Sequence, residues 1–238
     1  MAITTRGKSR NLERRQAIAA ICEQRGMVAN PVNLYTAFSA IFPMALPGQM
    51  PVFENSFGSP DGSIWAADMW TPKQDDHNRQ NKEWESFSMV AFNLAGVNLP
   101  YVGVTRKGQN NSTRLSRGSP LTLESIDFDE RFTIRADDRR SAVMLLDQGM
   151  MQWLLDCEQV SFEITGDRVQ ALVRRASESS YQPGLNPGWN LRGQSGAPQG
   201  NSRRADPAEL ELLFKFADGF GPRVPELVRS EFAAAPTT

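Results

Sequence analysis

Few side chains in this sequence could do chemistry, and they form no catalytic pattern. The 238 residues hold one histidine, His77, and two cysteines, Cys22 and Cys157. A histidine-dependent triad could use only His77, and a metal site would have to combine carboxylates with this one imidazole. No nucleophile elbow, HExxH, CxxC, phosphate-binding glycine loop or dinucleotide fingerprint is present. The sequence therefore predicts no catalytic residue, no metal and no cofactor.

One carboxylate stands out because its neighbours on an expected strand are apolar. Asp68 shares a strand face with Ile64, Ala66 and Trp70. A buried carboxylate needs a partner, and a hydrogen-bonded core aspartate is commoner than a catalytic one. We therefore expect a structural role. An unrecognised hydrolase stays open as an alternative, and it would need a cleft that unites His77 with Asp68 or another acid.

Residues 126–176 carry the clearest secondary-structure pattern. Apolar and polar residues alternate over 132–136, which predicts a strand. Asp137 or Asp138 then caps a first short helix, and Asp147 caps a second. These residues build a core, and none of them forms a chemical motif.

Further alternating runs predict more strands. Two of them flank Gly166-Asp167, the pattern of a hairpin with a two-residue turn. Others are expected at 63–71, 84–94 and 101–105, with the last pairing beside 84–94. Because the strands are mostly consecutive and joined by short loops, we predict a single α+β domain, in which helices pack on one face or end of an antiparallel sheet.

Composition divides the chain into five parts. Residues 1–10 form a basic segment, 11–176 the α+β core domain, 177–205 a flexible insertion, 206–232 C-terminal helices that pack on the core, and 233–238 a tail. We expect the first core helix to cover residues 11–25 and to end before Gly26.

The overall charge and hydropathy exclude two classes of protein. The chain has 26 basic and 27 acidic residues, so it lacks the electrostatic footprint of a nucleic-acid binder, and no nucleic-acid partner is expected. No run approaches the roughly 20 apolar residues that cross a bilayer, which predicts a soluble domain. Cys22 and Cys157 lie in apolar helical runs, where a small hydrophobic core residue is the usual role.

Two stretches could nevertheless form surfaces for binding. A basic cluster near the start is either a solvated end or a segment beside a membrane that carries anionic lipid. Its members are Arg6, Lys8, Arg10, Arg14 and Arg15. An apolar, proline-interrupted stretch could fill the core, line a groove or face a partner. The groove candidates are Phe38, Ile41, Phe42, Met44, Met50 and Trp65.

Three passages together resemble a known family. They are residues 14–20 with Arg25-Gly26, residues 128–132 leading into 137–142, and Leu145-Leu146 followed by 150–155. They resemble a family of actinobacterial, often membrane-anchored proteins of undefined chemistry, that of the mycobacterial trehalose monomycolate transport factors. The likeness covers roughly residues 11–176 and 206–232. Because the shared residues pack and cap, they mark kinship more than activity.

The resemblance implies a non-enzymatic accessory factor at the inner membrane. It implies an RND-type exporter of trehalose monomycolate as the partner, and an N-terminal membrane helix that this chain lacks. The basic cluster would then follow the anchor and place the domain on the cytoplasmic side. The family brings no catalytic residues to carry over. A lipid-binding domain that holds an acyl chain or glycolipid stays open as an alternative, with the groove candidates as its walls.

Overall fold

A computed structural model describes residues 3–29, 52–72, 84–107, 117–157, 159–175 and 207–234. Within these ranges nine strands form one antiparallel sheet in the order β1-β2-β3-β4-β9-β8-β5-β7-β6. The strands are β1 (Val28–Ala29), β2 (Val52–Gly58), β3 (Ile64–Pro72), β4 (Trp84–Asn93), β5 (Leu99–Arg106), β6 (Ser119–Leu121), β7 (Phe132–Ala136), β8 (Ser161–Gly166) and β9 (Arg168–Arg174). The predicted α+β class with an antiparallel sheet is confirmed.

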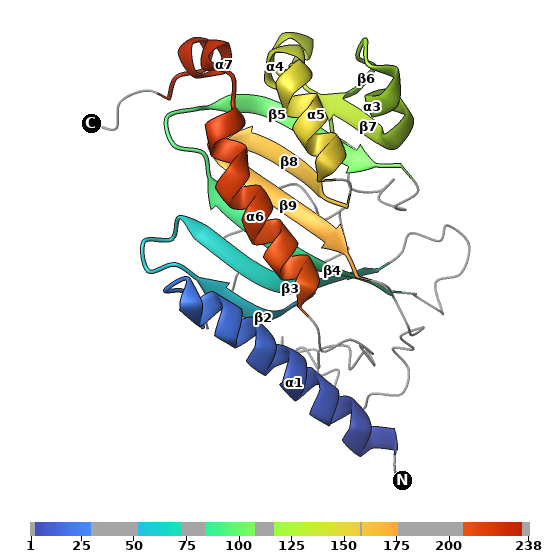
Figure 1. Cartoon of the computed structure of the whole chain (residues 1–238), viewed down its shortest axis with the longest axis vertical. Helices are drawn as coiled ribbons and strands as arrows, with labels where there is room; N and C mark the ends of the chain where they lie inside the picture. The colour runs from blue at the N-terminus through green and yellow to red at the C-terminus, as the bar shows by residue number, and fades with distance from the viewer. Residues whose placement is uncertain are drawn as a thin grey trace.

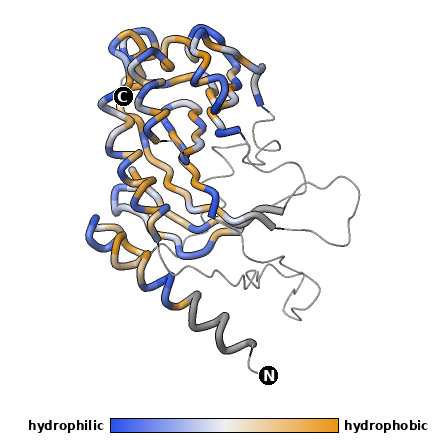
Figure 2. Tube along the Cα trace, turned by 45° about the vertical axis from the view of Figure 1, so that its right-hand side comes forward, coloured by the Kyte–Doolittle hydropathy of each residue, from blue (hydrophilic) through white to orange (hydrophobic). Residues whose placement is uncertain are grey.

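Six helices accompany the sheet in the described ranges. They are α1 (Ile3–Gln24), α3 (Ile126–Arg131), α4 (Arg139–Leu145), α5 (Gln148–Asp156), α6 (Ala208–Arg223) and α7 (Glu226–Glu231). Figure 1 shows α6 crossing one face of the sheet, α4, α5 and α7 gathered at the end of β5, and α1 beside β2. Figure 2 shows apolar residues concentrated in the central strands, beneath these helices. No helix of the described ranges is long and apolar enough to cross a membrane.

The main core lies between the sheet and its helices. An aromatic group at its centre joins β4, β8, α5 and α6: the rings of Phe162 and Phe220 lie 5.2 Å apart, and Trp153 stacks on Phe216 at 5.0 Å. Aromatic pairs of this kind add to the stability that burial of their area provides. The helical spacing of Leu210, Leu213, Phe214, Ala217 and Phe220 predicts the buried face of α6. Four of these side chains are buried, Ala217 is partly buried, and Phe216 is buried as well.

The pattern of residues 126–176 is confirmed at its caps and its turn. The Asp138 side chain accepts hydrogen bonds from the backbone N–H groups of Arg140 and Ser141, and Asp147 accepts one from Met150. Both carboxylates thereby satisfy amides that an α-helix leaves free at its start. Strands β8 and β9 pair antiparallel around the expected two-residue turn.

Three elements differ from the prediction. Strand β5 pairs with β7 and β8 rather than with β4, because β4 pairs with β3 and β9. Alternation along a strand reveals its faces but not its neighbours. Helix α1 begins at Ile3 rather than at the eleventh residue. Helix α7, which Val224, Leu227 and Phe232 predict from the sequence, leaves Leu227 exposed and buries Val228.

Helix α3 and strand β2 were not predicted. Ser125 caps α3, whose Phe128 is buried and stacks on Phe132 with ring centroids 4.7 Å apart. In β2 the register shifts between Glu54 and Phe57, and Asn55 has a φ of 48°. A bulge of this kind breaks the alternation by which a strand is read from sequence. The expected insertion at 177–205 lies outside the described residues.

We predict that Gly118→Ala destabilises the fold more than Gly96→Ala does. Both glycines have a positive φ, at 74° and 77°, so each alanine pays a backbone cost of about 1–2 kcal/mol. A Cβ on Gly118 would also lie 2.7 Å from the carbonyl carbon of Ala136, whereas a Cβ on Gly96 meets nothing within 4 Å. Urea unfolding should show roughly 1–3 kcal/mol of extra loss at Gly118. Equal losses would contradict this packing.

Candidate functional site

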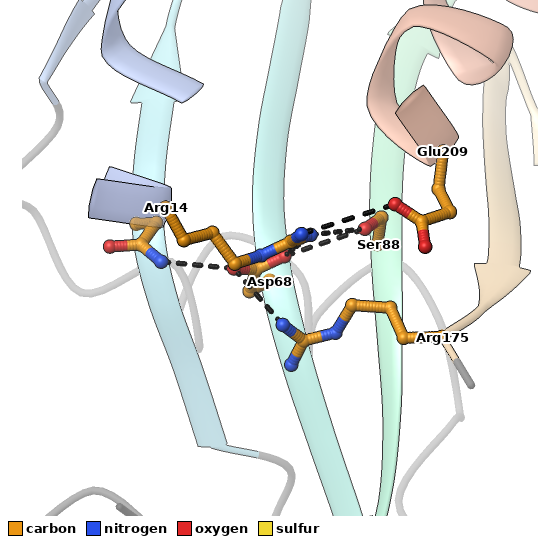
Figure 3. Close-up of polar contacts among 6 residues, drawn as sticks. Arg14, Asp68, Ser88, Arg175 and Glu209 are labelled. Atoms are coloured by element: carbon orange, nitrogen blue, oxygen red, sulfur yellow. Dashed lines mark hydrogen bonds and ion pairs between the residues drawn. The ribbon is translucent and has the colours of Figure 1, made fainter. Parts of the chain in front are cut away.

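A cluster of charged side chains is buried where the sheet meets α1 and α6. Asp68 of β3 lies at its centre and is 1 % exposed. Arg14 reaches it from α1, and Arg175 reaches it from just beyond β9 (Figure 3). Ser88 of β4 and Glu209 of α6 complete the labelled group. Segments far apart in the sequence therefore converge on one carboxylate.

Both oxygens of the Asp68 carboxylate accept hydrogen bonds. Arg14 donates from Nε to Oδ2 and from Nη2 to Oδ1, each at 2.9 Å. This fork geometry is the strong, two-bond form of an arginine–carboxylate pair. Asn55 Nδ2 donates to Oδ2 at 2.9 Å, and Ser88 Oγ donates to Oδ1 at 3.4 Å.

Two guanidinium groups and several carboxylates meet in this cluster. Arg175 Nη1 lies 3.4 Å from Asp68 Oδ2, and Arg14 Nη1 lies 3.9 Å from Glu209 Oε2. Glu54 also acts electrostatically on Arg175. Asp68, Arg14 and Arg175 are buried, and an unpaired charge there would be costly. Burial alone would raise the pKa of Asp68, but Arg175 and Arg14 outweigh it and hold that pKa below its usual value.

Strand register brings these groups together. Asp68 stands opposite Ser88 on β4 and opposite Glu54 on β2. Beyond the end of β9 the backbone N–H of Arg175 still donates to Ser86 at 2.9 Å, which continues the pairing with β4 and carries its side chain toward Asp68. The predicted structural role of Asp68 agrees with this geometry, because its carboxylate is enclosed by partners.

The basic cluster expected near the N-terminus is corrected at Arg14. Its side chain is 1 % exposed and turned inward, whereas Arg15 is exposed. The helical spacing in the sequence could have indicated this, because Arg14 lies on the same helix face as Ile18 and Cys22, which are buried. The backbones of Arg6, Lys8 and Arg10 belong to α1, and their side chains lie outside the described part.

Of the six residues expected to line an apolar groove, only Trp65 lies within the described residues. Its ring is half-buried on β3, and its Nε1 donates to the Gly62 carbonyl at 2.9 Å. The remaining groove candidates Phe38, Ile41, Phe42, Met44 and Met50 lie outside the described residues. His77 also lies outside the described residues, so the acid–imidazole pair that the hydrolase alternative needs stays a prediction.

The opposite face of the sheet carries a second, smaller apolar cluster built only from strands. Its residues are Phe53, Trp65, Ala67, Met69, Phe87, Met89, Ala91 and Leu172. Polar side chains continue this face toward β5: Tyr101 donates to Glu163 at 3.3 Å, and Gln170 lies against Met89. Burial, with Glu163 next in importance, raises the pKa of Tyr101. In the described part of the chain, the amide oxygen of Gln170 has no hydrogen-bond partner.

A second charged contact joins α1 to α6 at the surface. Arg25 donates from both terminal nitrogens to the Asp218 carboxylate, at 3.1 and 2.7 Å, and its guanidinium lies 4.3 Å from the centre of the Phe214 ring.

The described residues hold no group of three or more histidine, cysteine, aspartate or glutamate side chains that could bind a metal. Comparison with protein-family models, with curated proteins and with solved structures gives no match.

We predict that Asp68→Asn destabilises the protein by about 3–5 kcal/mol, because it leaves two buried guanidinium groups without their central carboxylate. The matched control is Asp218→Asn, which breaks a pair that is 34 % and 58 % exposed and should cost about 0–1 kcal/mol. Urea unfolding at neutral pH measures both changes. Similar losses would contradict the central role of Asp68.

The same variant should alter the dependence of stability on pH. The pKa of Asp68 is lower in the folded protein than its unfolded value of about 3.9, so its contribution is fully present above that value. It is lost as the pH falls below about 4 and through the folded pKa. Asp68→Asn should therefore lose less stability in acid than the unchanged protein does.

Proposed function

We propose that this chain is a non-enzymatic accessory factor for the export of trehalose monomycolate across the inner membrane. It acts by binding the RND-type exporter, as the mycobacterial trehalose monomycolate transport factor A does. The proposal rests first on the three passages that resemble that family. In this fold they include Arg14, the Phe128–Phe132 stack and the Asp138 cap, so the likeness falls on residues that build the core.

The observation that carries the proposal furthest is the course of α1. This helix runs without interruption from Ile3 to Gln24, a length of about 33 Å. Its C-terminal half is held by the Asp68 cluster, and its first turns project away from the sheet at the end opposite to the C-terminus (Figure 1). A membrane anchor ahead of such a helix would be coupled to the domain for as long as α1 stays docked.

The positive charge on the first turns of α1 fits the same proposal. Arg6, Lys8 and Arg10 lie along the projecting part of α1, next to exposed Arg15. Lysine and arginine gather on the cytoplasmic side of an anchor and are attracted to anionic lipid. The domain then stands at the cytoplasmic face of the inner membrane and offers its surface to the exporter.

We predict that the protein, tagged and purified from mycobacterial membranes in mild detergent, carries the exporter with it. A tagged, unrelated inner-membrane protein of similar abundance is the control. A variant with Arg6, Lys8 and Arg10 changed to Glu should recover less exporter, since it loses attraction to anionic lipid. Absence of the exporter from the captured material, in the presence of normal protein levels, would remove this function.

A second candidate function is the binding of an acyl chain or glycolipid. The face that carries the second apolar cluster favours it. Met69, Phe87 and Met89 are fully buried there, whereas Phe53 and Trp65 pack against them and are only partly buried. An acyl chain could pack against these two rings.

For this candidate, native mass spectrometry of the protein purified from mycobacterial cells should show a mass increment that corresponds to a lipid. Trp65→Ala should lower the loaded fraction, because Trp65 packs at the margin of the apolar cluster. Val143→Ala, at an exposed site on α4, is the matched control and should leave the fraction unchanged. A protein that carries no lipid would leave the accessory role as the sole proposal.

A further inference from the structure

We propose that α1 is a detachable arm, which opens and closes on the rest of the fold without global unfolding and is held shut by the Arg14–Asp68 pair. This inference concerns the internal mechanics of the domain and stands apart from the proposed export function. It follows from how little apolar surface docks α1, from how the cluster divides its charges, and from where Cys22 lies.

The docking of α1 depends on few apolar side chains. Among residues 12–24, whose side chains the structure describes, Ile18 and Cys22 are buried, Ala19 and Ile21 pack partly buried against the core, and Leu12 is 56 % exposed. The helix packs against β1 and β2 at the edge of the sheet. This part of α1 gains less from burial than α6, which buries five side chains in the main core. Charged contacts must therefore contribute much of the free energy that keeps α1 docked on the sheet.

Of the ion pairs that Arg14 and Arg25 make, those of Arg14 are the buried ones. Arg14 makes a two-bond pair with Asp68 that is shielded from solvent, and hydrogen bonds to charged groups in such places are strong. The pair between Arg25 and Asp218 lies at the surface, where water and salt weaken it. Release of Arg14 therefore decides whether α1 stays on the sheet.

The rest of the fold is equipped to keep Asp68 satisfied when α1 leaves. Arg175, Asn55 and Ser88 all contact the carboxylate, and all three belong to the sheet or its immediate continuation. After opening, Asp68 retains one guanidinium and two neutral donors, and water replaces Arg14. A core built without Arg175 would be left with an unpaired charge, so the second arginine makes opening a local event.

Cys22 gives a direct readout of this motion. It is 0 % exposed on the buried face of α1, and burial raises the pKa of its thiol to about 12. Both features suppress its reaction with a thiol reagent while α1 is docked, because the thiolate is the reactive form. When α1 opens, the thiol enters water and regains ordinary reactivity.

The test uses the full chain with Cys157→Ser, which leaves Cys22 as its sole thiol. Labelling of Cys22 by a disulfide reagent at pH 8 is followed at rising urea concentrations below the unfolding transition, and tryptophan fluorescence reports global unfolding. We expect labelling to depend weakly on urea, since local opening exposes little surface. A labelling rate with the same urea dependence as global unfolding would overturn the proposal, and this measurement needs no destabilised variant.

Two variants then test the latch itself. Arg14→Met keeps the length of the side chain and removes its charge, and it should raise the labelling rate on the order of 10- to 100-fold. Asp218→Asn removes the surface pair and should raise it by less than about fivefold. If Arg14→Met speeds labelling only as much as it lowers global stability, or no more than Asp218→Asn does, Arg14 is not the latch.

Discussion

The fold depends on the neutralisation of one buried carboxylate. Asp68 lies on a central part of the sheet where every neighbour on its face is apolar or paired, so it could not remain charged without close cations. Arg14 and Arg175 provide them from segments that lie far apart in the sequence. Because each comes from a different element, neutralising this carboxylate also fixes α1 against β3 and fixes the end of β9 beside β4. One electrostatic requirement thereby sets the position of three segments.

The two faces of the sheet differ in composition and in what packs against them. The face beneath α5 and α6 is a conventional core, in which phenylalanines from β8 and α6 pack around Trp153. The other face changes along the strand order from methionine and phenylalanine to tyrosine, glutamate and glutamine. In the described residues no helix contributes to its apolar cluster. This division is why the accessory role and the lipid-binding role draw on different parts of the same domain.

The connection between α1 and the sheet also bears on how the domain could be coupled to a membrane. A helix that projects from the domain transmits orientation only while its inner half stays docked, and that docking depends on Arg14 more than on apolar burial. A latch near the base of the helix would let such a domain alternate between a fixed and a released arrangement.

Local sequence signals determined the local structure well. Alternation identified β3, β4, β7, β8 and β9, and the short acidic side chains of Asp138 and Asp147 identified the two helix starts, because strand pleat and capping depend on neighbours in sequence. The bulge at Asn55 hid β2, since it disrupts that same alternation. The fate of Arg14 could have been inferred from its helix face, but its partner could not.

The sequence by itself thus determined the class of fold, the principal helices and strands, and the inward side of each. Only the tertiary structure decided which strands are neighbours, placing β9 beside β4 and β5 between β8 and β7. It also decided that Arg14, Asp68 and Arg175 meet. Strand order and long-range ion pairs depend on contacts between residues that are distant in sequence, and neither periodicity nor propensity carries that information.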